Sequence, residues 1–195
     1  MKPGTNKRII ALIPARQGSE RIKNKNIKFF FSHPLLAYAI YSARKSNLFD
    51  KIVVSTDSRK YAAIAKNYGA EVPNLRPKKI SSSKSSDYDW VNYTINLYDK
   101  KKIYFTHFFI LRPTNPFRTA ITIKRAWQKY IQFKNCDSLR GVSLTKEHPG
   151  KMWTQNNKYL FPLIKKKVSN QPSYNSQYKT LPEVFIQNGG ISRCC

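Results

Sequence analysis

Acidic residues, cysteine and glycine are scarce in this chain of 195 residues. It holds 10 Asp and Glu against 36 Lys and Arg, which gives a formal net charge of +26 at pH 7. Its 3 cysteines form neither a disulfide framework nor a zinc-ligand pattern, which favours a reducing, cytoplasmic location. The 7 Gly and 11 Pro are too few for a collagen-like or low-complexity chain.

Long apolar runs are absent as well. No stretch approaches the roughly 18–20 residues that a membrane-spanning helix needs. The apolar run over residues 9–13, which Pro14 ends, is too short for the core of a signal peptide. We therefore expect neither secretion nor a membrane partner. The hydrophobic fraction of 41%, with 11 Phe, 12 Tyr and 3 Trp, is nevertheless enough for a buried core.

The basic charge allows several classes of partner. Nucleic acid, an acidic membrane surface and phosphorylated small molecules are all attracted by such a charge. A solvated, lysine-rich surface without a specific partner is the plain alternative. The sequence shows no long basic tail, zinc finger or aromatic-rich RNA-binding signature, so a nucleic-acid partner is not favoured.

Short apolar segments alternate with amphipathic ones along most of the chain. Strands are expected at residues 8–13, 51–55, 70–76, 107–111, 138–144 and 182–186. Helices are expected from Pro34 onward, from a cap at Asp57-Ser58 to Asn67, from a cap at Asp87 through Leu97, and over 119–133. This alternation predicts an α/β fold with a mostly parallel sheet.

The loop after the first strand has the composition of a phosphate site. Ligands of open α/β sheets bind beyond the carboxyl ends of the strands. Between Pro14 and Asn26 the chain supplies a glycine, a serine hydroxyl, backbone N–H groups and several cations, which a triphosphate requires. Neither the Walker A pattern nor G-x-G-x-x-G is present, so a P-loop hydrolase and a dinucleotide oxidoreductase lose support. An exposed basic loop without a ligand is the alternative.

Several motifs together resemble the acylneuraminate cytidylyltransferase family. The loop motif reads Ile13-Pro14-Ala15-Arg16-x-Gly18-Ser19-x-Arg21-Ile22-x-x-Lys25-Asn26. Further motifs follow in the family's order, at residues 49–57, 68–77, 111–118, 148–153 and 181–189. The third of these later motifs matches a strand-end motif of that family and reads Leu111-Arg112-Pro113-Thr114-Asn115-Pro116-Phe117-Arg118.

The resemblance implies a fold and a reaction. The expected fold is a Rossmann-like, three-layer nucleotide-diphospho-sugar transferase with a small inserted dimerisation subdomain. One domain is expected over 1–195: an α/β core at 8–144, the insertion at 145–182 and a return to the core at 183–195. The implied reaction transfers CMP from CTP to the anomeric hydroxyl of a nonulosonic acid, a sialic-acid-like sugar, and releases pyrophosphate. The implied assembly is a homodimer.

The resemblance also implies roles for single residues. Arg16 and Lys25 would be catalytic, because they would neutralise the triphosphate. The implied nucleotide-binding residues are Ala15, Arg16, Gly18, Ser19, Lys25, Asn26, Arg76, Ser86 and Asp87. The implied sugar-binding residues are Arg112, Thr114, Lys151, Gln187, Asn188 and Gly189. The chain departs from the family at Glu20, where a lysine is common, and at Tyr178, where an arginine is expected.

The end of the chain and the metal raise a further expectation. Family members continue past the Gln187-Asn188-Gly189 motif, and the resemblance implies a Mg²⁺ cofactor whose Asp-x-Asp ligands lie in that continuation. We therefore expect a truncated, frameshifted or fragmentary chain that binds nucleotide better than it turns it over. Two alternatives remain: a cytidylyltransferase for 3-deoxy-manno-octulosonate, and a non-catalytic basic remnant that binds nucleotide or nucleic acid.

Overall fold

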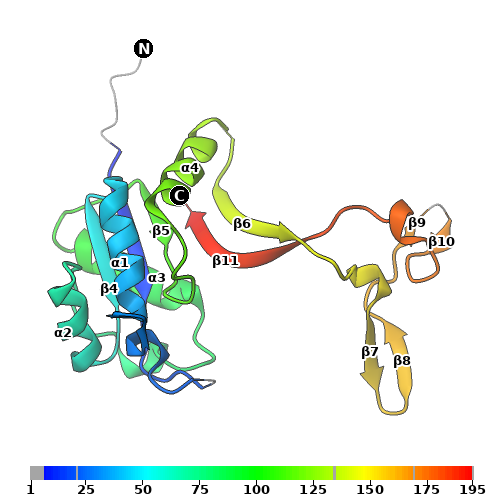
Figure 1. Cartoon of the computed structure of the whole chain (residues 1–195), viewed down its shortest axis with the longest axis horizontal. Coiled ribbons are helices and arrows are strands. Elements are labelled where there is room, and N and C mark those ends of the chain that lie inside the picture. The colour runs from blue at the N-terminus through cyan, green and yellow to red at the C-terminus, as the bar shows by residue number, and fades with distance from the viewer. Residues whose placement is uncertain (1–6, 21, 134, 169, 195) are drawn as a thin grey trace. The chain divides into compact units, whose positions relative to one another are not determined.

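The computed structural model describes residues 7–20, 22–133, 135–168 and 170–194. It divides the chain into two compact units (Figure 1). The first unit comprises Met1–Gly141 and Gly189–Cys195, and the second comprises Val142–Asn188. No helix among the described residues has both the length and the hydrophobicity of a transmembrane span.

A five-stranded sheet organises the first unit, in the strand order β4-β1-β5-β11-β6. Its strands are β1 (Ile9–Pro14), β4 (Lys51–Ser55), β5 (His107–Ile110), β6 (Ser138–Leu144) and β11 (Phe185–Cys194). Strand β1 pairs in parallel with both β4 and β5, whereas β11 runs antiparallel to β5. The predicted α/β class with a mostly parallel sheet is thereby confirmed.

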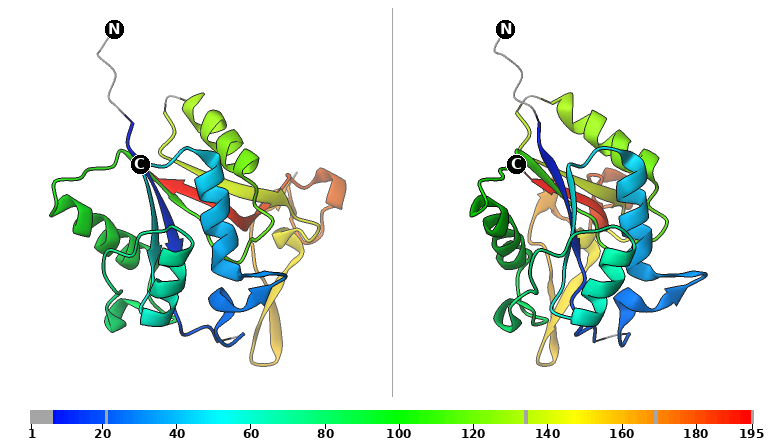
Figure 2. Two further views of the ribbon diagram at one scale, coloured as in Figure 1. Left: turned by 60° about the vertical axis from the view of Figure 1, so that its left-hand side comes forward. Right: turned by 90° about the vertical axis from the view of Figure 1, so that its left-hand side faces the viewer.

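Both faces of the sheet are covered by helices, which makes three layers (Figure 2). The helices are α1 (Leu35–Ser46), α2 (Arg59–Asn67), α3 (Asp87–Asp99) and α4 (Ala120–Ile131). Side chains of β1 alternate between the layers, because successive residues of a strand point to opposite faces. Ile9, Ala11 and Ile13 pack with α1, α2 and α4, and Ile10 and Leu12 pack with α3. This two-sided burial explains the continuous apolar run in the sequence.

The helix starts follow from local capping chemistry. The Ser58 side chain accepts a hydrogen bond from the Tyr61 N–H and starts α2. Ser86 starts α3 through a capping box with Asp89, in which each side chain bonds the other residue's backbone N–H. The cap expected at Asp57-Ser58 is therefore confirmed at Ser58, whereas the cap expected at Asp87 lies one residue earlier, at Ser86.

One predicted strand is wrong. Within residues 70–76 only Glu71 bridges to the sheet, beside Val53. Its N–H donates to the Ile52 carbonyl at 2.8 Å, and its carbonyl accepts from the Val54 N–H at 2.9 Å. Pro73 follows two residues later and has no N–H to continue the ladder. The last predicted strand is also displaced, because β11 begins at Phe185 rather than Pro182.

The connections between the longer elements of the first unit contain short turns and strands. They are the 3₁₀ turns η1 (Lys25–Ile27) and η2 (Lys78–Ile80) and the two-residue strands β2 (Phe29–Phe30) and β3 (His33–Pro34). Strands β2 and β3 form a small antiparallel hairpin.

The second unit is a set of hairpins and turns. Strands β7 (Trp153–Asn156) and β8 (Tyr159–Pro162) form an antiparallel hairpin, as do β9 (Lys167–Val168) and β10 (Gln171–Pro172). Two 3₁₀ turns complete it, η3 (Pro149–Lys151) and η4 (Tyr178–Thr180). The Lys151 ammonium donates to the carbonyls of Tyr174 and Ser176, which ties η3 to the segment after β10.

Candidate functional site

A polar cleft opens at the carboxyl ends of β1 and β5, within the first unit. Its cavity volume is about 390 Å³. It is lined by Pro14, Arg16, Ser19, Glu20, Lys25, Asn26, Arg76, Ser82, Ser83, Ser85, Asp87, Trp90, Arg112, Pro113 and Thr114. Strand ends, the loop after β1, the serine loop before α3 and the start of α3 all contribute. This is the edge of the sheet at which α/β proteins bind ligands.

The loop after β1 is held in place by its own side chains and by β4. The Gln17 N–H donates to Asp57 Oδ1 at 2.8 Å, which attaches the loop to the residues that follow β4. Asn26 is buried, and its Nδ2 donates to the Arg16 carbonyl at 3.0 Å across the loop. Arg16 and Lys25 therefore reach the cleft from a backbone that is positioned before any ligand binds.

Arg76 is a buried cation at the floor of the cleft. Its Nε donates to Ser55 Oγ at 3.1 Å, and its Nη2 donates to the Ser55 carbonyl at 2.9 Å. Its guanidinium carbon lies 5.0 Å from the centroid of the Trp90 ring, in cation–π range. Burial lowers the pKa of Arg76 to about 10, although the charges of Asp57 and Asp87 oppose this shift. Arg76 therefore keeps its charge at neutral pH.

Asp87 connects two sides of the cleft. Its Oδ1 accepts a hydrogen bond from Trp90 Nε1 at 2.9 Å. Its Oδ2 accepts from Arg112, the first residue after Leu111 at the end of β5, in an ion pair. One continuous chain of contacts thus runs along the cleft, through Ser55, Arg76, Trp90, Asp87 and Arg112.

The turn after β5 is fixed from below by Arg118. This side chain is buried, and its Nη2 donates to the Arg112 carbonyl at 3.3 Å. Burial lowers the pKa of Arg118 to about 10. The turn that carries Pro113 and Thr114 into the cleft is therefore supported by a buried cation that does not itself line the cavity.

The structure brings most of the predicted nucleotide-binding side chains together. Arg16, Ser19, Lys25, Asn26, Arg76 and Asp87 line the cleft, together with Arg112 and Thr114, which were predicted to bind the sugar. Two predicted residues have other positions. Ala15 is fully buried and its N–H donates to the Ser55 carbonyl at 2.9 Å, and Ser86 caps α3. Around Gly18 there is open space, since an added Cβ would meet only Arg16 Nη1, at 3.8 Å.

The remaining predicted sugar-binding residues lie elsewhere in the chain. Lys151, Gln187 and Asn188 belong to the second unit, and Gly189 belongs to the first. The Lys151 ammonium has backbone partners, and Asn188 Nδ2 donates to Ser143 Oγ at 3.1 Å. Their assignment to the sugar stays a prediction.

Sequence reasoning missed several residues that build the cleft. Trp90 lies within the helix expected from Asp87 through Leu97, and nothing in the sequence indicates a polar partner for its indole N–H. Ser82, Ser83 and Ser85 lie between the expected elements, although the Ser82 N–H donates to Ser85 Oγ at 3.1 Å and their loop borders the cavity. The serine cluster itself was the available signal, because hydroxyls at a strand-end loop suit phosphate or sugar oxygens.

The three-layer arrangement and the cationic strand-end cleft are those of Rossmann-like nucleotidyltransferases. The model of the family described as cytidylyltransferase matches residues 10–159, and the chain belongs to this family. The resemblance to the acylneuraminate cytidylyltransferases inferred from the motifs is thereby confirmed.

Relatives of the chain include enzymes named for several nonulosonic acids. It is 40% identical over 123 residues to an N-acylneuraminate cytidylyltransferase of Escherichia coli O18:K1:H7, which covers 63% of this chain and 28% of the relative. It is 39% identical over 141 residues to a CMP-N,N'-diacetyllegionaminic acid synthase of Legionella pneumophila, covering 70% and 60%. A pseudaminic acid cytidylyltransferase of Campylobacter jejuni is 37% identical over 123 residues, covering 63% and 53%. The matches span 28%, 60% and 53% of these relatives' lengths.

Solved structures show the same fold at low identity. A CMP:2-keto-3-deoxy-manno-octonic acid synthetase complexed with CTP matches with a TM-score of 0.68 at 14% identity, over 96% of this chain and 74% of that one. A 4-diphosphocytidyl-2C-methyl-D-erythritol synthase from Anaerococcus prevotii matches with a TM-score of 0.56 at 11% identity, over 96% and 71%.

Proposed function

We propose that this protein transfers CMP from CTP to the anomeric hydroxyl of a nonulosonic acid. The hydroxyl oxygen forms a bond to the α-phosphorus and loses its proton. The bond between the α-phosphorus and the oxygen that bridges to the β-phosphate breaks, and pyrophosphate leaves with that oxygen. The names of the relatives support this reaction class.

The observation that carries the proposal is the charge of the cleft. Arg16, Lys25, Arg76 and Arg112 outnumber Glu20 and Asp87 among its lining residues. A triphosphate is a polyanion, and a cleft that is lined by cations with low-dielectric walls attracts one. Phosphoryl transfer is catalysed mainly by positioning and by stabilising charge, which fixed cations provide.

Under this proposal, one group of residues binds the triphosphate and a second group binds the cytosine and ribose. Arg16 and Lys25 hold the triphosphate, with Ser19 and loop N–H groups on phosphate oxygens. Asn26 and Arg76 contact the cytosine and ribose. The rigid attachment of Asn26 and Arg76 supports this division, because recognition of a base needs donors in fixed directions.

The resemblance implies a Mg²⁺ ion, which needs carboxylate oxygens as ligands. No group of three His, Cys, Asp or Glu that could hold a metal occurs among the described residues. Of the two carboxylates that line the cleft, Asp87 has both oxygens engaged, by Trp90 and by Arg112. The described residues thus do not form a metal site of their own, and the charge stabilisation proposed here rests on the cations.

Pyrophosphate release tests the reaction. The protein is assayed with CTP, UTP or ATP, and with N-acetylneuraminic, legionaminic, pseudaminic or 3-deoxy-manno-octulosonic acid as acceptor. We expect release with CTP and a nonulosonic acid only, and its loss in Arg16→Ala. Release with 3-deoxy-manno-octulosonic acid alone would establish the alternative substrate. Selective CTP binding without release from any acceptor would refute the transferase proposal and leave a nucleotide-binding protein.

We further propose that the protein is a homodimer that uses the β7–β8 hairpin. Four large apolar side chains of this hairpin are exposed: Trp153, Tyr159, Leu160 and Phe161. Aromatic and apolar anchors of this kind are enriched at interfaces. Light scattering in high salt should give twice the 22.7 kDa chain mass, and Leu160→Asp should reduce it. A wild-type mass of one chain would contradict the dimer.

A further inference from the structure

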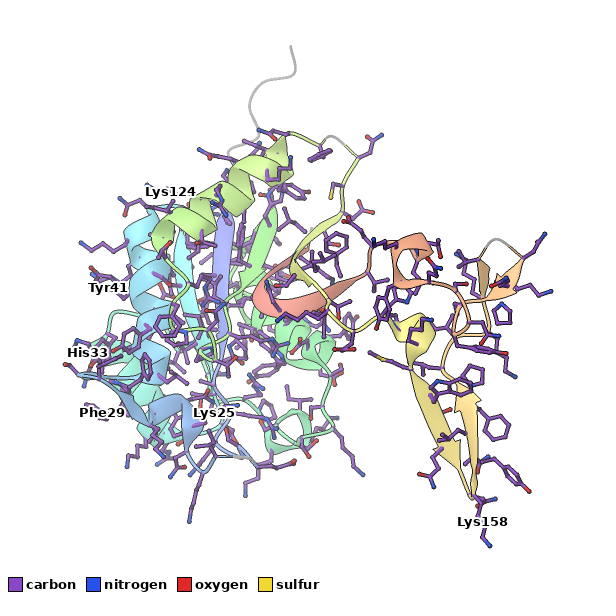
Figure 3. All side chains as sticks on the ribbon, turned by 45° about the vertical axis from the view of Figure 1, so that its right-hand side comes forward. Lys25, Phe29, His33, Tyr41, Lys124 and Lys158 are labelled. Atoms are coloured by element: carbon purple, nitrogen blue, oxygen red, sulfur yellow. The ribbon has the colours of Figure 1, made fainter. Side chains whose placement is uncertain are left out.

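Four aromatic side chains project into solvent from the first unit. Phe29 and Phe31 belong to the β2–β3 hairpin and are 69% and 83% exposed. Phe117, in the turn after β5, is 77% exposed, and Tyr41 on α1 is 62% exposed. Figure 3 shows Phe29 and Tyr41 on the same side of the molecule. Apolar groups of this size and exposure, close together, mark interaction sites.

Phe30 links the aromatic residues near the hairpin. Its ring centroid lies 4.8 Å from that of Phe31 and 5.6 Å from that of Phe117, and both pairs are edge-to-face. It also lies 5.8 Å from Tyr38, whose hydroxyl donates to the Phe30 carbonyl. Phe31 and Phe117 thus lie around Phe30, while Phe29 of the same hairpin and Tyr41, three residues after Tyr38 on α1, lie on one side of the molecule (Figure 3). We call Phe29, Phe31, Tyr41 and Phe117 the aromatic face.

The backbone at Phe31 makes its side chain unexpected there. Its φ is +52°, in the left-handed region that glycine and asparagine adopt readily and bulky residues rarely do. The side chain is also the most exposed of the four. Neither the turn nor burial therefore accounts for a phenylalanine at this position, and an external partner would.

The two stretches of sequence that carry the aromatic face hold cations and no carboxylates. No Asp or Glu occurs between Glu20 and Asp50, or between Asp99 and Asp137, the stretches that supply the whole face. Lys45 Nζ lies 5.6 Å from the centroid of the Tyr41 ring. Other exposed cations lie on the same segments: Lys28, Arg44, Lys124 and Arg125.

We propose that the aromatic face docks the protein onto an anionic lipid surface. Aromatic rings settle at the boundary between headgroups and acyl chains, and lysines and arginines beside them bind anionic headgroups. This association is peripheral and requires no spanning helix. The expectation of no membrane partner rested on the lack of spanning and secretion segments in the sequence, and that lack does not bear on peripheral binding through this face.

Two other occupants fit less well. A second copy in a symmetric contact would bring the same cations against one another, because both subunits use the same patch. A single-stranded nucleic acid stacks successive bases on aromatic rings, whereas the planes of Phe31 and Phe117 lie at 74° and 85° to that of Phe30 between them. A lipid interface needs only that the rings project.

Vesicle sedimentation of the full chain tests the proposal, with phosphatidylcholine vesicles that contain or lack phosphatidylglycerol. The test variant is Phe31→Asn, because asparagine tolerates the left-handed turn and the fold is retained. The control is Tyr104→Asn, which removes an aromatic ring that is 61% exposed in the connection between α3 and β5 and is not part of the aromatic face. Both substitutions leave the net charge unchanged, so they separate insertion of rings from general attraction.

We expect binding to the anionic vesicles only, and about tenfold weaker binding for Phe31→Asn, the effect of withdrawing one apolar side chain. Tyr104→Asn should bind as the wild type does. Equal binding by the wild type and both variants would overturn the proposal, since charge alone would then explain it. The proposal would also be overturned if Phe31→Asn bound vesicles as the wild type does but no longer bound RNA. The same holds if this variant bound vesicles normally but changed from a dimer to a monomer. Pyrophosphate release does not depend on the aromatic face, so none of these outcomes bears on the proposed reaction.

Discussion

Trp90 is the residue whose replacement tests most directly how the cleft is built. Its ring supports the Arg76 guanidinium at 5.0 Å, and its Nε1–H donates to Asp87 at 2.9 Å. Trp90→Phe keeps an aromatic ring but removes the donor and weakens the cation–π contact, because indole is the stronger partner. We expect a folded protein that binds CTP less tightly.

The magnitude follows from the two contacts. A hydrogen bond to a charged group contributes about 1.5–3 kcal/mol, but the Asp87 carboxylate is partly exposed and water replaces much of that. The change of ring costs Arg76 about 0.5–1 kcal/mol. The free energy of unfolding should therefore fall by about 1–2 kcal/mol, and CTP affinity should fall about threefold to fivefold.

Isothermal titration with CTP and urea unfolding measure the two effects separately. The matched control is Trp127→Phe, which makes the same substitution on the opposite face of the sheet, where Trp127 packs against Phe109. It should lower stability without changing CTP affinity. If Trp90→Phe binds CTP as the wild type does, or if Trp127→Phe weakens CTP binding equally, the contacts under the cleft do not position Arg76 for the nucleotide.

Three further changes have expected outcomes. Arg16→Ala should weaken CTP binding by about 2 kcal/mol, roughly thirtyfold, because it removes a charge-assisted contact to phosphate, and calorimetry measures it. Asp57→Ala should increase hydrogen exchange at the Gln17 amide, which loses its acceptor at 2.8 Å, and lower stability by about 1 kcal/mol. Burial and the bond to Glu71 raise the pKa of Tyr98 above its ordinary value of 10, so the folded state holds this proton longer than the unfolded state. Stability should therefore fall as the pH rises above 10, and urea unfolding should show a smaller fall for Tyr98→Phe than for the exposed control Tyr104→Phe.

The sequence predicted those elements of the fold whose signals are local. Strand β6 occupies the predicted residues 138–144, and β1, β4 and β5 agree to within one or two residues at each end. Buried parallel strands are apolar on both faces, and prolines end two of these runs. The segment at 70–76 also has apolar residues, but Glu71, Pro73, Asn74 and Arg76 interrupt them, and only Glu71 bridges to the sheet. Pro73, which has no N–H for the ladder, was the available signal against a strand.

The candidate site was predictable where a charge or hydroxyl belongs to a motif. Arg16 and Lys25 belong to a strand-end loop whose cations suit a triphosphate, and Arg76 was implied by the family motif at residues 68–77. Trp90 and Asp57 were not, because each acts through another residue: Trp90 supports Arg76, and Asp57 holds the Gln17 N–H. Contacts of this second kind depend on which elements meet in space, and no spacing along the chain reports them.

Arg76 and Arg112 are held in different ways, and the difference bears on selectivity. Arg76 is buried and bonded twice to Ser55, so a ligand meets a donor that is already ordered and loses little entropy there. Arg112 is partly exposed and paired with Asp87, so a ligand anion must replace one ion pair by another, and the net gain at such a site is small. Discrimination between ligands should therefore arise mainly at the Arg76 side of the cleft, whereas Arg112 should contribute mainly to the charge that an anionic ligand meets. Under the proposed reaction, the sugar acid and the nucleotide would then share one cleft without competing for the same rigid cation.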